Sequence, residues 1–305
     1  MDGFIARVMI GAARGPNTTL SYAMDIRAER SRRVGSAIYG LGLIGFGWVA
    51  LAHLDALPAL EPISTSFPLR PLLGVVTAIV LIGCGALLVT KRQALQAAVS
   101  AGAFFAFLLV SLHIPNLAAH PLSGGAWVVA FEVVAISSAA WMLSAALMLD
   151  GAADSRQRTV WRRVGVVARQ AFAISLLAFG ASHFIYHQYV ESVIPAWIPA
   201  HRFWAYAVGI AFLAAGAAIS TGIKARLAAT LLAVMFGSWV LLVHSPRVVT
   251  HSPNANEWTS LLVAVAMCGG SWLVGVCFAQ LDQAVEDAGV ASRGVRAKGR
   301  QLASL

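Results

Sequence analysis

The chain contains eight stretches of mostly apolar residues, each long enough to form a membrane-spanning helix. They cover approximately residues 35–54, 72–90, 94–113, 126–149, 164–185, 203–221, 226–244 and 259–280. A helix needs about 20 such residues to cross the hydrocarbon core of a bilayer. Only 11% of the residues are charged and the mean hydropathy is +0.75, so this much apolar surface does not fit inside a soluble core. The sequence therefore predicts an all-α membrane protein with eight transmembrane helices.

The basic residues between these stretches predict the orientation. Of the 22 Lys and Arg residues, 19 lie in the two ends of the chain, in the breaks at 91–92, 150–163 and 222–226, or at Arg169 just inside the fifth stretch. Arg70, Arg202 and Arg247 fall on the opposite side. Because cytoplasmic loops carry the excess of Lys and Arg, both termini are expected to be cytoplasmic in a bacterial-type inner membrane. The net charge of +9 thus indicates membrane orientation rather than nucleic-acid binding.

The two halves of the chain share residues at an offset of 131. Because each half holds four stretches, both have the same orientation, as in parallel repeats of transporters. We therefore predict two parallel four-helix bundle repeats, 34–149 and 164–281, joined by a cytoplasmic linker, 150–163. Basic cytoplasmic segments, 1–33 and 282–305, flank them, and residues 4–13 are expected to form an amphipathic surface helix. The matched pairs are Pro68 and Pro199, Gly85 and Gly216, His113 and His244, Pro115 and Pro246, His120 and His251, Trp127 and Trp258, and Trp141 and Trp272.

The three cysteines, Cys84, Cys268 and Cys277, lie in apolar stretches, and no two form a CxxC pair. Buried structural thiols are therefore expected rather than a disulfide or a dithiol redox motif. The sequence contains no Gly-rich phosphate loop, no Ser-His-Asp order and no nucleotide fingerprint.

All eight histidines fall on the predicted outer side. His183 and His187 are four residues apart, so on one helix they share a face and can bind one metal ion. His113 and His244 end the third and seventh stretches, each before a proline that is expected to terminate the helix. Imidazole suits Zn, Cu, Fe or haem and also hydrogen bonds a quinone carbonyl. The alternative is that these histidines are interfacial polar residues that cap helix ends. The full set is His53, His113, His120, His183, His187, His201, His244 and His251.

Glu132 lies about six residues inside the fourth stretch. An ionisable residue at this depth is costly and predicts a functional group with a partner, for which His53 or His113 of the same half is expected. Trp197 lies at the predicted outer interface, where tryptophans commonly anchor the chain to lipid headgroups.

The second half contains four characteristic segments: Phe179-Gly180-Ala181-Ser182-His183-Phe184, Ile194-Pro195-Ala196-Trp197-Ile198-Pro199, Phe203-Trp204 and the segment from Gly209 to Gly216. With these segments, the second half resembles the DoxX-like family of four-helix membrane proteins. His183 and Trp197 fall on family motif positions, whereas Phe212 stands where the family often has a glutamate. The resemblance implies a link to membrane redox systems such as quinol oxidases and thiosulfate:quinone oxidoreductases, often as a small subunit.

The leading hypothesis is therefore the membrane subunit of a quinone-linked oxidoreductase complex. Glu132 and His183 would be catalytic, and His113, His187, Trp197 and His244 would bind the cofactor. Quinone, haem and a transition metal (Cu, Zn or Fe) all remain open, with His183 and His187 as the metal ligands. The alternative is a non-enzymatic accessory or assembly subunit that packs against partner subunits of a larger membrane complex. Transport ranks third, because the parallel repeats favour it but the stretches show no charged pathway.

Overall fold

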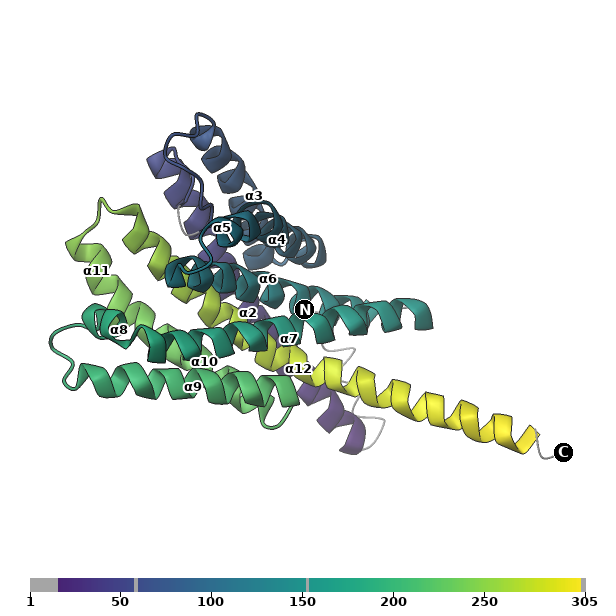
Figure 1. Cartoon of the computed structure of the whole chain (residues 1–305). Coiled ribbons are helices and arrows are strands. Elements are labelled where there is room, and N and C mark those ends of the chain that lie inside the picture. Colours follow the sequence, from purple (N-terminus) through teal and green to yellow (C-terminus); the bar gives the residue numbers. More distant parts are fainter. Residues whose placement is uncertain (1–15, 58–59, 152–153, 303–305) are drawn as a thin grey trace.

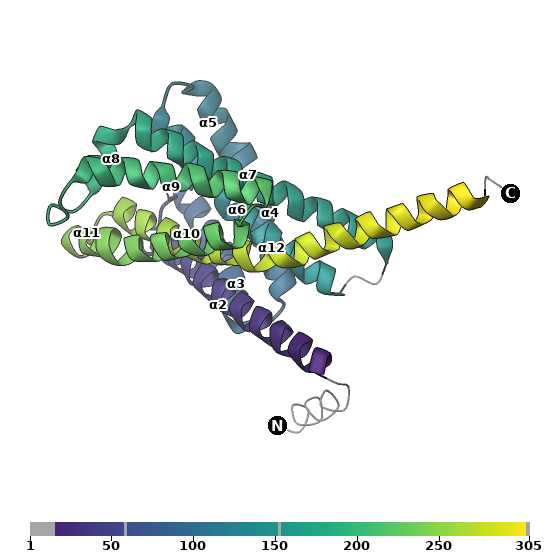
Figure 2. The same ribbon diagram turned by 90° about the horizontal axis from the view of Figure 1, so that it is seen from below.

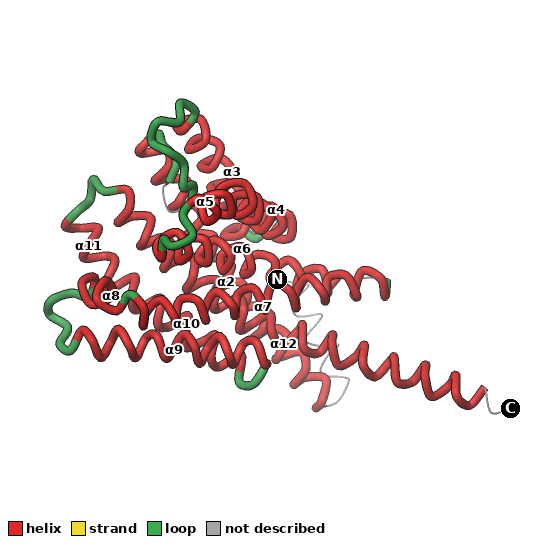
Figure 3. Tube along the Cα trace, viewed as in Figure 1, coloured by secondary structure: helices red, strands yellow, loops and turns green. Residues whose placement is uncertain are grey.

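The computed structural model describes residues 16–57, 60–151 and 154–302, and within these ranges every regular element is helical (Figures 1 and 3). Eight of the described helices are long and apolar enough to cross a membrane, which confirms the predicted number of spans. The surface helix predicted at 4–13 lies outside the described residues.

Each predicted stretch corresponds to one long helix. In the first half these are α2 (Pro16–His53), α3 (Arg70–Thr90), α4 (Ala94–Leu108) and α6 (Gly124–Gly151). In the second half they are α7 (Ser155–Ile185), α9 (His201–Thr221), α10 (Ala225–Trp239) and α12 (Ala255–Leu302). Short helices follow at the end of the bundle that is predicted to face outward, namely α5 (Ile114–Ala119), α8 (His187–Val193) and α11 (Ser245–Thr250). Two π-helical turns, η1 (Leu109–His113) and η2 (Val240–His244), precede α5 and α11.

Most element bounds recur 131 residues later. Helices α3 and α9, α4 and α10, and α5 and α11, together with η1 and η2, correspond at both ends with this offset, and α6 and α12 begin with it. The turn between α3 and α4 is left-handed at Lys91 and Gln93, and the turn between α9 and α10 is left-handed at Gly222 and Lys224. The second turn uses glycine at its first position, where a positive φ carries no steric cost.

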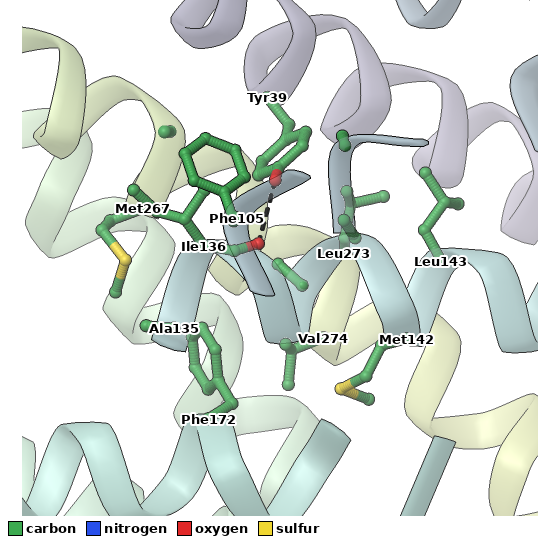
Figure 4. Packing of buried hydrophobic residues seen from close by; sticks show 14 of the residues in the cluster. Tyr39, Phe105, Ala135, Ile136, Met142, Leu143, Phe172, Met267, Leu273 and Val274 are labelled. Carbon is green, nitrogen blue, oxygen red and sulfur yellow. Dashed lines mark hydrogen bonds between the residues drawn. The ribbon is translucent and has the colours of Figure 1, made fainter. Parts of the chain in front are cut away.

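The core of the bundle is formed by α6 and α12, the two most buried spans. Helix α2 packs against α12, and α7 packs against α6. The Tyr39 hydroxyl of α2 donates a 2.9 Å hydrogen bond to the Ile136 carbonyl of α6 (Figure 4). Small residues allow these close approaches, since a Cβ on Gly270 would lie 3.0 Å from Ala139. Helices α3 and α4 pack on one side of this core, and α9 and α10 on the other.

Polar contacts define one end of the bundle. Arg32 of α2 contacts Asp150 at the end of α6 at 2.7 Å and also donates to Gln280 of α12. The start of α2 and the distal parts of α6 and α12 therefore lie together. The eight histidines lie at the opposite ends of their helices or in the loops there, together with α8 and α11 (Figure 2).

The prediction that Pro115 and Pro246 terminate their helices was wrong. In both cases the helix widens into a π turn and continues for six more residues. Proline lacks an N–H and its ring crowds the preceding turn, and the wider turn relieves this crowding. At the second turn, the backbone N–H of Ser245 donates to the Val240 carbonyl, and the Ser245 hydroxyl donates to the same oxygen at 2.6 Å.

Candidate functional site

His183 lies on the last turn of α7, where this helix approaches α9 closely. Gly209 makes the approach possible, because a Cβ at that position would lie 3.0 Å from the Cβ of His183. The His183 ring meets Phe212 edge-on, with 5.3 Å between ring centroids. Its Nδ1 lies 2.8 Å from the Phe179 carbonyl oxygen. A carbonyl only accepts hydrogen bonds, so Nδ1 carries the proton, and Nε2 of the neutral ring is left as an acceptor.

His187 belongs to a different local structure. Helix α7 ends at Ile185, and His187 begins α8. Its ring lies 5.5 Å from Tyr206 of α9, six residues from the Phe212 that contacts His183. The expectation that both imidazoles project from one continuous helix face was therefore wrong, because the backbone turns at Tyr186, with φ −112° and ψ 33°.

Glu191 holds His187 in place. The His187 Nδ1 lies 2.9 Å from Glu191 Oε1, and the same oxygen accepts from Arg202 Nε at 3.2 Å. The hydrogen bond from His187 lowers the pKa of Glu191, and the Arg202 guanidinium contributes to the same effect. This cluster is a half-exposed network in which an imidazole and a guanidinium both contact one carboxylate.

The residues around His183 and His187 do not supply enough donor groups for a metal centre. Across the described ranges, no three His, Cys, Asp or Glu residues converge closely enough to hold a metal ion. Protein zinc sites use at least three protein ligands. The metal role predicted for His183 and His187 therefore stays a prediction without a third ligand.

The other predicted site residues are dispersed. Trp197 lies in the loop before α9 and is 65% exposed, as expected of an interfacial anchor. Glu132 on α6 is half-buried and makes no hydrogen bond or ion pair with any other described residue. The expected pairing of Glu132 with His53 or His113 is therefore absent from the structure.

The equivalent histidines of the two π turns differ. His113 is 1% exposed, and its Nε2 lies 2.9 Å from the Leu60 carbonyl oxygen, so it ties the 54–69 loop to the bundle. His244 is less buried, yet its Nδ1 is buried and has no hydrogen-bond partner among the described residues. Neither histidine contacts His183 or His187 through a ring or hydrogen bond.

Three ion pairs at the end predicted to face outward were not foreseen from the sequence. Each of the three arginines at this end pairs with one acid, as Arg70 does with Asp55, Arg202 with Glu191 and Arg247 with Glu257. The sequence did contain a signal for such pairs, because the loops predicted to face outward hold both arginines and acidic residues. These are Arg70, Arg202 and Arg247, and Asp55, Glu61, Glu191 and Glu257. Pairing them needed the positions of the loops, which sequence spacing did not supply.

The fourth outer acid, Glu61, lies in the 54–69 loop and is 2% exposed. Its carboxylate accepts from Thr77 Oγ1 at 2.6 Å and from the Leu57 N–H at 3.1 Å. Burial raises the pKa of Glu61 against the opposing effect of these hydrogen bonds. The nearby Asp55 behaves oppositely, since the hydrogen bonds from Arg70 lower its pKa.

The chain was compared with known proteins. A family model described as a domain of unknown function, DUF8561, matches residues 172–267. The match runs from within α7 to within α12 and includes His183, His187 and His244. No curated protein and no solved structure matches the chain.

Proposed function

We propose that the chain is the membrane subunit of a quinone-linked redox system in a bacterial-type cytoplasmic membrane, with cytoplasmic termini and an outer-side site at His183. The observation that carries this proposal is the fixed tautomer of the His183 ring. Its Nδ1 donates to the Phe179 carbonyl, so Nε2 accepts a hydrogen bond or a proton from a ligand. The resemblance to DoxX-like proteins supports the same conclusion, because His183 falls on a motif position of that family.

The proposal treats the two halves as diverged parallel repeats. The 131-residue offset of the element bounds supports this view. So does the reciprocal packing, in which the last helix of each half contacts the first helix of the other: α6 meets α7, and α12 meets α2. This reciprocal helix packing is expected of two repeats related by an axis along the membrane normal.

The surroundings of His183 suit an aromatic headgroup better than a metal ion. Phe212 contacts Phe179, Phe236 and Trp239 in one aromatic cluster beside the imidazole. Aromatic walls bind a flat ring through offset or edge-on contacts. A single imidazole acceptor then orients one hydroxyl of a hydroquinone, whereas the donor set for a metal ion is incomplete.

The chemistry assigned to the site is quinol oxidation. A hydroquinone loses two protons and two electrons to become the quinone; His183 Nε2 accepts one proton, water at the site accepts the other, and both electrons pass to an electron acceptor, a haem or a metal centre, of a partner subunit. We assign Glu132 to proton transfer in the outer half of the bundle, because it is an ionisable group without a structural partner. His187 and His244 shape the outer end of the second half, and Trp197 anchors the loop beside them.

The test measures the amounts of quinone and haem that co-purify with the protein in its native lipids. Lipid extraction should recover quinone from the wild type, and His183→Gln should lower the amount by at least about tenfold. His120→Gln is the matched control, because His120 is exposed and contacts only the Asn116 carbonyl. Absence of quinone and of a haem band in the wild type, or equal quinone in both variants, would contradict the proposal.

The second candidate function is a non-enzymatic accessory subunit. It is favoured by the exposure of α10. In the apolar stretch that includes α10, 22% of the residues are buried, against 39% in the stretch that includes α4. Its outward stripe includes Leu227, Leu231 and Val234, each more than half exposed. A partner subunit that covers this stripe would protect it from a lipid-soluble crosslinker. Under this function, His183→Gln combined with His187→Gln would leave the activity of the assembled complex unchanged.

A further inference from the structure

Arg169 of α7 is a charged residue for which the described part of the chain supplies neither a hydrogen-bond acceptor nor a counterion. It is half-buried and lies about 8 Å inside the fifth apolar stretch, which begins at residue 164. Its Nε atom is buried and has no hydrogen-bond partner among the described residues. Its two terminal nitrogens donate to no described residue either, but they are not buried. An arginine at this depth requires an anionic partner.

The other arginines with buried or half-buried side chains mostly have such a partner. Arg32, Arg70 and Arg247 each form an ion pair with a carboxylate. Of the arginines in the described ranges that are not exposed, Arg162 and Arg169 alone form none. They are seven residues apart on α7, and this spacing places both on one face of the helix. One face of α7 therefore carries two positive charges without a protein counterion.

An aromatic ring holds the Arg169 guanidinium without neutralising it. The Cζ atom of Arg169 lies 5.4 Å from the centroid of the Phe278 ring of α12. A cation over a ring face is attracted by the quadrupole of the ring, so this contact fixes the position of the charge. The same ring packs against the turn between α9 and α10, because a Cβ on Gly222 would lie 3.4 Å from Phe278 Cζ. Lys224 follows in this turn and is exposed, which adds a third cation at this end of the second half.

The polar residues beside Arg169 do not balance its charge. Gln170 donates to the Ser220 carbonyl at 3.1 Å and accepts from the Ser220 hydroxyl at 2.6 Å, so these two side chains satisfy each other. Asp282 lies one turn after Phe278 on α12, but it is exposed and forms no ion pair with any described residue. The anion that Arg169 needs therefore has to come from outside the described chain.

We propose that Arg169 binds the phosphate of an anionic phospholipid, in the leaflet at the end of the bundle opposite the histidines. The phosphate oxygens accept hydrogen bonds from the terminal nitrogens of the guanidinium, whose planar geometry matches a phosphate. The surplus of basic residues at this end favours an anionic lipid over a zwitterionic one. Ile223, which follows Gly222 in the turn, is 70% exposed and offers an apolar contact to an acyl chain.

The lipid site is specific to the second half. The residues 131 positions before Arg169 and Phe278 are Ile38 and Leu147, so the first half has an apolar pair at the equivalent place. The site is also independent of the proposed function, because it lies at the other end of α7 from His183 and involves no electron transfer.

Native mass spectrometry of the full chain tests the proposal. The protein is transferred into micelles with equal amounts of phosphatidylglycerol and phosphatidylcholine, and the bound lipid is measured. The wild type should retain phosphatidylglycerol preferentially, and Arg169→Gln should lower the retained amount by at least about tenfold. Arg92→Gln is the matched control and should retain the wild-type amount, because Arg92 is exposed and lies at the same end in the first half. Excess inorganic phosphate should not displace the lipid, because free phosphate lacks the acyl chains.

Two further variants separate the role of the charge from that of the ring. Arg169→Lys keeps the charge but loses the planar donor group, so its retention should lie between those of the wild type and Arg169→Gln. Phe278→Leu removes the cation–π contact and should lower retention by about threefold. Thermal unfolding in the same detergent shows which variants are folded, and these two decide the matter if Arg169→Gln is not.

Three results would overturn the proposal. The first is wild-type retention of phosphatidylglycerol in Arg169→Gln, or in both Arg169→Lys and Phe278→Leu. The second is an equal loss in Arg92→Gln, which would mean that general surface charge attracts the lipid. The third is displacement of the lipid by inorganic phosphate, which would identify a free anion as the ligand.

Discussion

At the end of the bundle that carries the histidines, the two halves have helices with recurring bounds but place their polar groups differently. In the first half, Arg70 and Glu61 are buried and fasten the 54–69 loop to α3 through Asp55 and Thr77. In the second half, the corresponding region is helix α8, and its network of His187, Glu191 and Arg202 is half-exposed. The fold therefore accommodates different networks of polar side chains at this end. The chemistry of each half has to be inferred from its own residues.

The largest expected effect is at Arg70, whose side chain is buried although that of its partner Asp55 is 44% exposed. Arg70→Met should lower the free energy of unfolding by about 2–4 kcal/mol, because it leaves the Ile63 carbonyl and Asp55 without their donor. Arg247→Met should cost about 1 kcal/mol or less, since the Arg247 side chain is 35% exposed against 9% for Arg70. Thermal unfolding in the same detergent measures both. Equal losses would remove the proposed contrast between the halves.

The next effect concerns close helix contacts. A Cβ on Gly85 would lie 2.4 Å from the Gly40 carbonyl oxygen, and a Cβ on Gly180 would lie 2.9 Å from the Gly209 carbonyl oxygen. Gly85→Ala should therefore cost about 1–3 kcal/mol, and Gly180→Ala should cost less. Gly83→Ala is the control, because no atom lies within 4 Å of its Cβ position. If Gly83→Ala lowered the free energy of unfolding as well, the losses could not be attributed to the close contacts at Gly85 and Gly180.

The pH dependence should differ in sign between the halves. Burial raises the pKa of Glu61, so the folded state binds its proton more tightly than the unfolded state does. Its contribution to stability is present at low pH and is lost as the pH rises from the ordinary value of 4.5 through the raised pKa. The pKa of Glu191 is lowered, so its contribution is present above 4.5 and is lost as the pH falls.

Unfolding temperatures of the wild type, Glu61→Gln and Glu191→Gln across pH 2.5–8 check both signs. Relative to the wild type, Glu61→Gln should gain stability as the pH rises, and Glu191→Gln should gain stability only as the pH falls below 4.5. Parallel curves for all three proteins would refute the assignment.

The sequence predicted the long-range pattern better than the local geometry. Apolar length is sufficient to locate spans, so all eight were found and most bounds agree within a few residues. Long helix extensions were missed, since α2 begins at Pro16 and α12 runs to Leu302. Helix starts outside an apolar stretch depend on polar contacts and capping, which hydropathy does not register.

The candidate site was predictable only as a set of residue types. The sequence placed all histidines on one side, but a spacing of four residues implies a shared face only on an unbroken helix, and Tyr186 breaks it. Proline was expected to stop two helices, whereas a π turn accommodated it. The contacts of Glu61 depend on how a loop folds back, and no periodic pattern encodes that. All three cysteines are free thiols; Cys84 and Cys277 are buried as expected, whereas Cys268 is only partly buried.

The most direct test of the proposed function is the amount of quinone that co-purifies with three proteins in native lipid: the wild type, His183→Gln and the control His120→Gln. We expect quinone in the wild type, at least about tenfold less in His183→Gln, and an amount near that of the wild type in His120→Gln. Quinone absent from the wild type, or retained in full by His183→Gln, would contradict it.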